Sequence, residues 1–107
     1  MNEKYVLLLL FISSVAVATI AAGEYDVGQK NKSFTVENLS IKVGDQVKFS
    51  NQDPFFHNVF SLSDTKTFDL GSYPQGQFKV VTFDKPGRVD VECAIHPTMH
   101  MTIDVKP

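Results

Sequence analysis

The chain has 107 residues, three histidines and a single cysteine, and its formal net charge at neutral pH is −2. This length suits one domain, and a single cysteine excludes an internal disulfide. The charges are scattered without a basic run, so neither nucleic acid binding nor strong electrostatic steering toward a partner is expected.

The first 23 residues differ in composition from the rest of the chain. A short start that carries Lys4 is followed by an apolar run from Val6 to Ile20 and by small residues at 21–23. This order is typical of a secretory signal peptide. We therefore predict a signal segment over 1–23 and one exported domain over 24–107. The alternative is an uncleaved membrane anchor, although the run is a little short for a span of about 20 residues.

Export makes the lone cysteine informative. A small exported domain often carries disulfides, and an unpaired thiol there is a liability unless something occupies the sulfur. A bound metal would occupy Cys93 and would also add folding free energy.

From residue 24 onward the sequence is strand-like, and no stretch shows a convincing helical period. Apolar and polar residues alternate, as in Gly87–Cys93 and Met101–Val105, and this period of two is typical of half-buried β-strands. Residues that favour turns separate the runs. The predicted strands are Glu24–Gln29, Ser33–Val36, Leu39–Lys42, Gln46–Asn51, Asn58–Ser61, Thr67–Leu70, Gln77–Phe83, Gly87–Cys93 and Met101–Val105.

Many short strands with regular turns predict an all-β sandwich or barrel. The stretch 61–73 is the least regular part of this pattern. It mixes Ser, Asp, Thr and Gly, and we predict a loop or a broken strand there.

Four residues near the ends of predicted strands carry metal-ligating side chains. Cys93 ends a strand, His96 and Met99 follow it in a Cys-x-x-His-x-x-Met pattern, and His57 stands at the start of a strand well upstream. One thiolate, two imidazoles and one thioether form the ligand set of a blue-copper electron-transfer site. Pro97 stiffens the short connection by fixing one backbone angle. We therefore predict that His57, Cys93, His96 and Met99 bind one copper ion where two strands meet at one end of the domain.

Two neighbouring side chains offer alternatives. Met101 also lies close to the second histidine, but alternation places it on the core face with Ile103 and Val105, so Met99 is the favoured axial ligand. His100 stands between the two methionines and is expected to point to solvent.

These residues carry a resemblance to a known family. The spacing at 93–99, the run 43–53 followed by His57-Asn58-Val59, and the turn at 83–87 resemble the cupredoxins, most closely the amicyanin- and pseudoazurin-like small blue copper proteins. The resemblance covers about 34–105. It implies a Greek-key β-sandwich, one type 1 copper ion and electron shuttling in the periplasm. It also implies that Asn58 helps to tie the ligand loops together.

The expected function is one-electron transfer between Cu(I) and Cu(II) without substrate chemistry, so the protein is not expected to be an enzyme. We expect a monomer whose redox partners, such as a c-type cytochrome or a periplasmic dehydrogenase, dock weakly over a small interface. The electron is expected to leave through His96. The predicted docking surface around it is apolar and contains Pro54, Phe55, Phe56, Pro97 and Met99.

Two other functions are compatible with the same sequence. A copper carrier or periplasmic copper-resistance protein would use the same ligands but exchange metal instead of electrons. A metal-free β-sandwich interaction module would leave Cys93 and the histidines incidental.

Overall fold

The computed structural model describes residues 21–107, so most of the predicted signal segment lies outside the described residues. The described part forms nine strands and no helix, and hence contains no helix able to cross a membrane. The strands are β1 (Glu24–Lys30), β2 (Ser33–Phe34), β3 (Asn38–Lys42), β4 (Gln46–Asn51), β5 (His57–Ser63), β6 (Lys66–Tyr73), β7 (Phe78–Thr82), β8 (Gly87–Cys93) and β9 (His100–Lys106).

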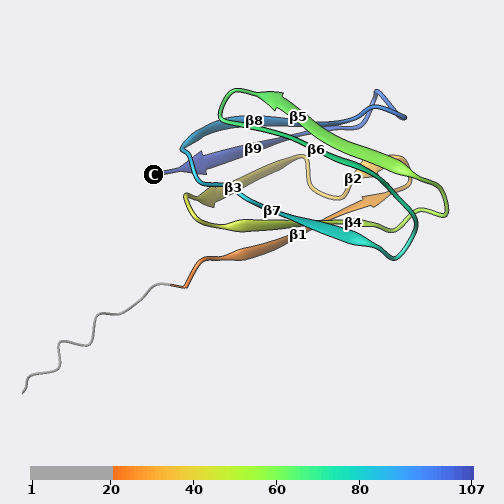
Figure 1. Cartoon of the computed structure of the whole chain (residues 1–107), viewed down its shortest axis with the longest axis horizontal. Helices are drawn as coiled ribbons and strands as arrows, with labels where there is room; N and C mark the ends of the chain where they lie inside the picture. The colour runs from red at the N-terminus through yellow and green to blue at the C-terminus, as the bar shows by residue number, and fades with distance from the viewer. Residues whose placement is uncertain (1–20) are drawn as a thin grey trace, which may run out of the picture.

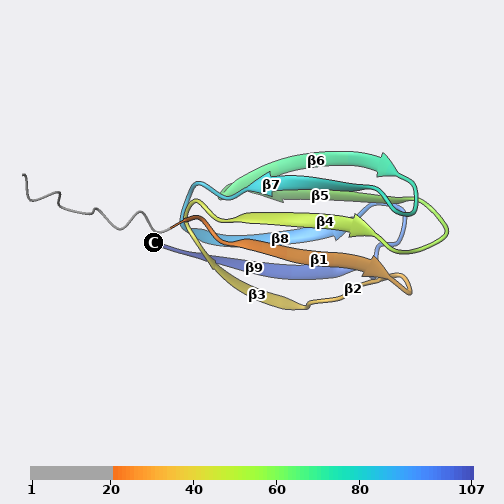
Figure 2. The ribbon, with the colours of Figure 1, turned by 90° about the horizontal axis from the view of Figure 1, so that it is seen from below.

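The strands form two sheets that pack face to face, which is the predicted Greek-key β-sandwich (Figure 2). One sheet has the order β2-β1-β4-β7 and the other the order β3-β9-β8-β5-β6. The pairs β1·β4 and β3·β9 are parallel, and the other pairs are antiparallel. Because the chain passes repeatedly from one sheet to the other, each sheet combines segments that are distant in sequence.

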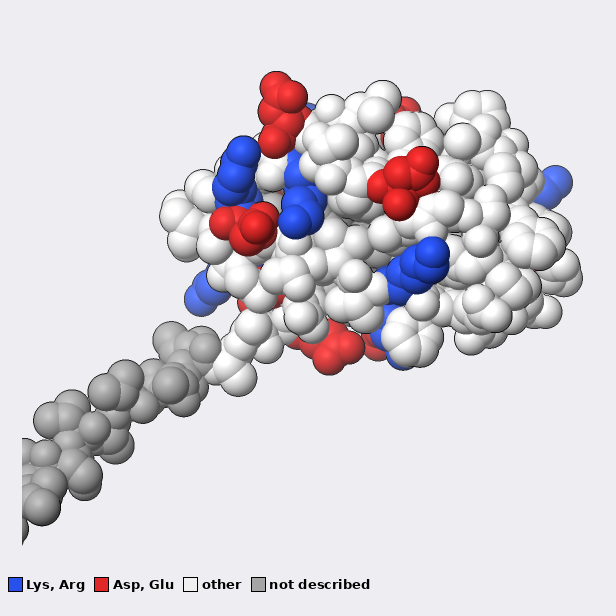
Figure 3. Space-filling view, in the orientation of Figure 1, with Lys and Arg blue, Asp and Glu red and all other residues white. Residues whose placement is uncertain are grey.

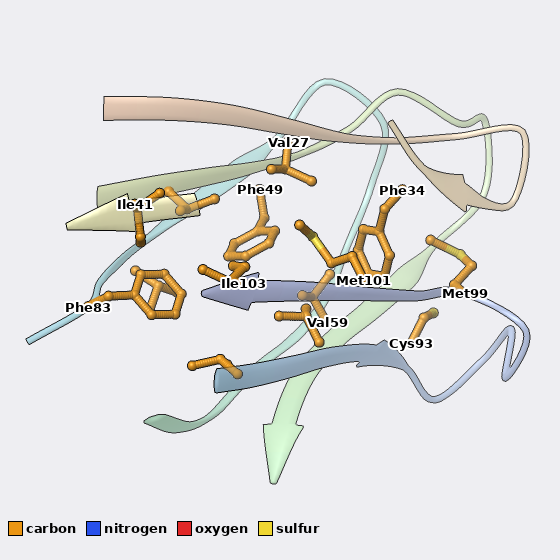
Figure 4. Close-up of a cluster of buried hydrophobic side chains, with 14 of the residues drawn as sticks. Val27, Phe34, Ile41, Phe49, Val59, Phe83, Cys93, Met99, Met101 and Ile103 are labelled. Atoms are coloured by element: carbon orange, nitrogen blue, oxygen red, sulfur yellow. The ribbon is translucent and has the colours of Figure 1, made fainter. Parts of the chain in front are cut away.

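The core lies between the sheets and comes from the alternation read in the sequence. In β4, Val47 and Phe49 are buried while Lys48 and Ser50 are only half-buried. Full burial of one such apolar side chain contributes about 1.5–3 kcal/mol. Figure 4 shows the cluster, which includes Val27, Phe34, Ile41, Val59, Phe83, Cys93, Met99, Met101 and Ile103.

The two ends of the sandwich differ in what they carry. The connections β1–β2, β4–β5, β6–β7 and β8–β9 meet at one end, and the C-terminus lies at the other (Figure 1). All four predicted ligands lie at the first end, which is called the metal end below. The other end, called the distal end, carries the connections β3–β4, β5–β6 and β7–β8.

The stretch 61–73 is more regular than predicted. β5 and β6 pair antiparallel from His57 opposite Tyr73 to Ser63 opposite Lys66, with a register shift between Asn58 and Phe60. The strand predicted over Thr67–Leu70 lies within β6, and a register shift does interrupt its pairing, but the prediction of a loop was wrong for two physical reasons. β6 is an edge strand with weak alternation between half-buried and exposed positions, and an irregularity of this kind interrupts the period of two.

The strand predicted over Ser33–Val36 is shorter in the structure. Only Ser33 and Phe34 pair with β1, opposite Lys30 and Gln29. Beyond Phe34 the chain leaves this sheet and joins the other one, where β3 pairs with β9.

Candidate metal centre

Two adjacent strands bring the predicted ligands together. β5 begins at His57, β8 ends at Cys93, and the strands pair with Val59 opposite Cys93. His96 lies in the connection from β8 to β9, where the Met99 N–H donates to the His96 carbonyl (2.9 Å) and closes a turn. The backbone path therefore places both histidines and the cysteine at the same end of the sandwich.

Three side-chain donors converge there. Nδ1 of His57 lies 3.7 Å from Sγ of Cys93 and 3.2 Å from Nδ1 of His96, and the donor atoms of the three residues lie within 4.8 Å of one another. Bonds from a transition metal to imidazole nitrogen or thiolate sulfur are about 2 Å long, so one ion can reach all three donors. One sulfur and two nitrogens suit copper far better than a hard cation such as magnesium or calcium.

Met99 lies at the metal end but is buried. It is 1% exposed, and Figure 4 shows Met99 and Cys93 at the same end of the core. The prediction that Met99 contributes to the exposed apolar surface was therefore wrong, because the turn after His96 directs its thioether inward. Met101 is fully buried on β9, opposite Val91, as alternation predicted.

His100 takes no part in the donor cluster. Its side chain is exposed, and its Nε2 lies 3.2 Å from Oδ1 of Asp90, which also accepts hydrogen bonds from Arg88. The prediction that His100 points to solvent is confirmed.

Asp53, which the sequence reading did not single out, contacts the first histidine. Its Oδ2 lies 2.7 Å from Nε2 of His57, and its carboxylate also accepts the N–H groups of Asn31 (2.7 Å) and Lys32 (3.1 Å). Burial alone would raise the pKa of Asp53, but the hydrogen bonds from His57, Lys32 and Asn31 outweigh it and hold this pKa below its ordinary value. An ionised carboxylate at Nε2 favours the neutral His57 tautomer that carries its proton there, and the lone pair of Nδ1 is then available to a metal ion.

Phe55 packs against both histidines. Its ring centroid lies 5.2 Å from that of His57 and 5.3 Å from that of His96. The Nζ of Lys32 lies 5.6 Å from the same centroid. Phe55 is half-buried whereas Phe56 is 53% exposed. The alternation expected for a consecutive pair is therefore present, with Phe55 inward and Phe56 outward.

The surface around His96 is apolar, and it is called the His96 surface below. On the face shown in Figure 3, charged side chains gather away from the metal end, which is mostly uncharged. Ile95 is 48% exposed, and the sequence reading missed it because its neighbours were assigned to the ligand loop. The exposed members of the His96 surface are Pro54, Phe56, Ala94, Ile95 and Pro97.

Asparagines tie the ligand loops together, but not in the way that the resemblance implied. The Asn58 side chain turns toward Asp69 (3.5 Å), and only its backbone carbonyl reaches the ligand loop, by accepting the N–H of Ala94 (3.2 Å). The buried side chain of Asn51 donates to the carbonyls of Phe55 (2.8 Å) and Tyr73 (2.9 Å). Asn51 therefore joins the β4–β5 and β6–β7 connections beneath the histidines.

The sandwich fold and the cluster of one buried cysteine, one buried histidine and one half-buried histidine define a cupredoxin, the class of small type 1 copper proteins. The profile of the copper-binding proteins of the plastocyanin/azurin family matches residues 21–106. The chain belongs to this family.

Relatives of known name agree with this membership. The methylamine utilization protein MauL of Methylorubrum extorquens (strain AM1) is 31% identical over 86 residues, covering 79% of this chain and 75% of MauL. A Cu(I) form of an amicyanin variant has a TM-score of 0.73 and 26% identity, over 83% of this chain and 88% of that chain.

A copper-containing nitrite reductase (NirK) from Thermus scotoductus SA-01 is also similar, with a TM-score of 0.75 and 28% identity over 87% of this chain. This chain spans only 25% of the reductase. Family, relatives and site geometry together show an electron carrier with one type 1 copper ion, and not an enzyme.

Proposed function

We propose that His57, Cys93 and His96 would hold one copper ion and that the thioether of Met99 would supply a further, weaker contact. The convergence of the three donor atoms within 4.8 Å, with Nδ1 of His57 near both Sγ of Cys93 and Nδ1 of His96, carries this assignment. Met99 is chosen over Met101 because it lies on the same turn as His96, whereas Met101 belongs to the regular core face of β9.

The protein framework suits a site that changes charge without moving. A thiolate and two imidazoles serve both Cu(I) and Cu(II), and a distant thioether does not impose the square geometry that Cu(II) prefers. His57 is fixed by Asp53 and Phe55, and Cys93 by its place at the end of a paired strand. Ligands held in this way need little reorganisation, which keeps electron transfer fast.

The proposed assignment is tested by the visible spectrum of the purified protein after addition of one equivalent of Cu(II). We expect an intense blue thiolate-to-copper band that Cys93→Ser abolishes. The matched control is His100→Ala, which removes a nearby exposed histidine and should leave the band unchanged. Loss of the band in His100→Ala, or its survival in Cys93→Ser, would contradict the assignment.

We further propose that redox partners dock on the His96 surface and that the electron leaves through His96. Partial exposure of His96 within a largely apolar surface supports the proposal. A c-type cytochrome or a periplasmic dehydrogenase is the expected kind of partner. Docking of this kind is weak and transient, as an electron carrier requires.

Phe56→Asp tests the docking surface, because it places a charge on an exposed aromatic member of the His96 surface. We expect the electron-transfer rate with a c-type cytochrome to fall about tenfold, the scale of an interface residue that contributes 1–2 kcal/mol. The control is Leu62→Asp, which charges an even more exposed apolar side chain (74% against 53% for Phe56) on the distal half of β5. Equal rates for wild type and Phe56→Asp would remove the docking proposal.

The proposed location is the periplasm, with 1–23 as the signal segment and 24–107 as the mature monomeric domain. The composition of the first 23 residues and the unpaired Cys93 support this proposal. N-terminal sequencing of the protein from a periplasmic fraction, combined with its mass in solution, tests it. Recovery of the uncleaved chain from the membrane fraction would instead indicate an anchor.

A further inference from the structure

One carboxylate connects a turn that is distant in sequence with the first copper ligand. Asp53 is buried in the β4–β5 connection, and both of its oxygens are used. Oδ1 accepts the N–H of Asn31 (2.7 Å), while Oδ2 accepts the N–H of Lys32 (3.1 Å) and lies 2.7 Å from Nε2 of His57. The backbone N–H of Asp53 donates to Oδ1 of Asn51 (2.8 Å). The carboxylate is thus held in place independently of the histidine.

The turn that holds Asp53 has an uncommon backbone. Asn31 and Lys32 join β1 to β2 with φ values of 55° and 56°, a left-handed conformation that is favoured in two-residue hairpins but is uncommon for lysine. In this conformation both N–H groups face the same carboxylate. Consecutive backbone N–H groups arranged in this way form a concave anion-binding site, and here the anion is the side chain of Asp53.

The N–H groups of Asn31, Lys32 and the His57 ring all face Asp53, so the group between them must accept hydrogen bonds and donate none. An ionised carboxylate can accept from two N–H groups and an imidazole N–H at once, whereas an amide of the same shape must turn its NH₂ toward at least one of them. When the neutral His57 ring donates through Nε2 to Asp53, Nδ1 is the nitrogen that carries the lone pair. That atom is the one that faces Cys93 and His96.

We propose that Asp53 is the positioning residue of the copper site. Held by the β1–β2 turn, it fixes the ring orientation and the tautomer of His57, so that Nδ1 is presented to the metal. The proposal rests on the ligand assignment made under Proposed function. Outer contacts of this kind commonly change metal affinity by about 10–100-fold when they are removed.

Asp53→Asn tests the proposal with readouts that simple loss of stability would not move. We expect Cu(II) affinity to fall about 10–100-fold, the blue band and the copper EPR spectrum to change, and the reduction potential to rise. A negative charge beside a ligand favours the more highly charged Cu(II) ion. Asp53→Asn removes this charge, so the reduction potential should rise.

The matched control is Asp45→Asn at the distal end. Asp45 is buried and likewise accepts two backbone N–H groups, from Gly23 (2.7 Å) and Lys42 (2.8 Å), but its hydrogen bonds reach no histidine. We expect this variant to lower the stability of the metal-free protein while its copper spectrum and potential stay at the wild-type values. Equal shifts of the potential in both variants would overturn the proposal, because a general effect on the fold would then explain them.

A second measurement uses the metal-free wild-type protein and therefore does not depend on whether the variant folds. Long-range ¹H–¹⁵N spectra, recorded under conditions in which the His57 ring is neutral, should show its proton on Nε2 and the lone pair on Nδ1. The opposite tautomer, or an exchanging mixture of both, would overturn the proposal.

The outcomes separate this inference from the copper assignment on which it rests. A blue wild-type protein whose Asp53→Asn variant keeps the same affinity, spectrum and potential would overturn the role of Asp53 alone. A wild-type protein without the blue band would overturn the copper assignment and the inference together.

Discussion

At each end of the sandwich one buried aspartate accepts hydrogen bonds from two backbone N–H groups. At the distal end Asp45 joins Gly23, just before β1, to Lys42 at the end of β3. At the metal end Asp53 does the same for the β1–β2 turn but also contacts His57. The same way of joining strand ends is therefore found at both ends, but only at the metal end does the aspartate also contact a proposed metal ligand.

The largest predicted effect separates the two ends by their response to copper. Copper at about 1,000 times its dissociation constant should add about 4 kcal/mol to the free energy of unfolding. Cys93→Ser should remove this increment because the thiolate is lost, whereas Asp45→Asn should keep it. Urea unfolding with and without copper measures both. An undiminished increment in Cys93→Ser would contradict the assigned site.

Tyr73→Phe tests how firmly the metal end is held from beneath. The Tyr73 hydroxyl donates to the Phe49 carbonyl (2.9 Å) and accepts from Nε2 of Gln29 (2.9 Å), and all of these groups are buried. Removing the hydroxyl leaves a donor and an acceptor without partners. We expect the metal-free protein to lose about 1–3 kcal/mol of unfolding free energy. Unchanged urea unfolding would show that the region relaxes around the loss.

The acid limb of stability tests the distal aspartate. Backbone hydrogen bonds from Lys42 and Gly23 hold the pKa of Asp45 below its ordinary value of 3.8. The unfolded chain therefore binds more protons in this range, and the stabilisation is present above about pH 5 and lost as pH falls through the folded pKa. Asp45→Asn should flatten this limb in pH titrations of metal-free unfolding. Part of the acid limb should remain in this variant, because the pKa values of Asp53 and Asp90 are also lowered. A limb as steep as that of the wild type would contradict the role of Asp45.

The smallest predicted effect distinguishes Asp45 from an ordinary surface pair. Lys66 and Asp84 form an exposed ion pair with a distance of 3.4 Å between Nζ and Oδ1. Because exposed pairs contribute about 0–1 kcal/mol, Asp84→Asn should change the unfolding free energy by less than about 0.5 kcal/mol. Thermal unfolding in low and high salt measures this change. A larger loss in Asp84→Asn than in Asp45→Asn would reverse the proposed ranking.

Much of the fold could be predicted from local pattern. β4 and β8 were predicted with their exact bounds, because Gln46–Asn51 and Gly87–Cys93 alternate cleanly and end at turn residues. The stretch 61–73 could not be predicted in the same way, since an edge strand and a register shift leave no clear period of two. Pairing with β5, and not local alternation, makes β6 a strand.

For the proposed site, too, local sequence pattern could predict one part but not the contacts between distant segments. Cys93, His96 and Met99 form a local spacing that points to copper without any structure. Asp53 does not, because its partners at 31 and 32 become neighbours only when β1 pairs with β4. An aspartate four residues before a candidate ligand was the only available signal, and it gains meaning only from the fold.

A crystal structure of the copper-loaded protein tests the central claim most directly. The account predicts one ion bonded to Nδ1 of His57, Nδ1 of His96 and Sγ of Cys93, with a longer contact to Met99. An ion bonded through Nε2 of His57, or one held by His100 or Asp53 in place of these atoms, would contradict it.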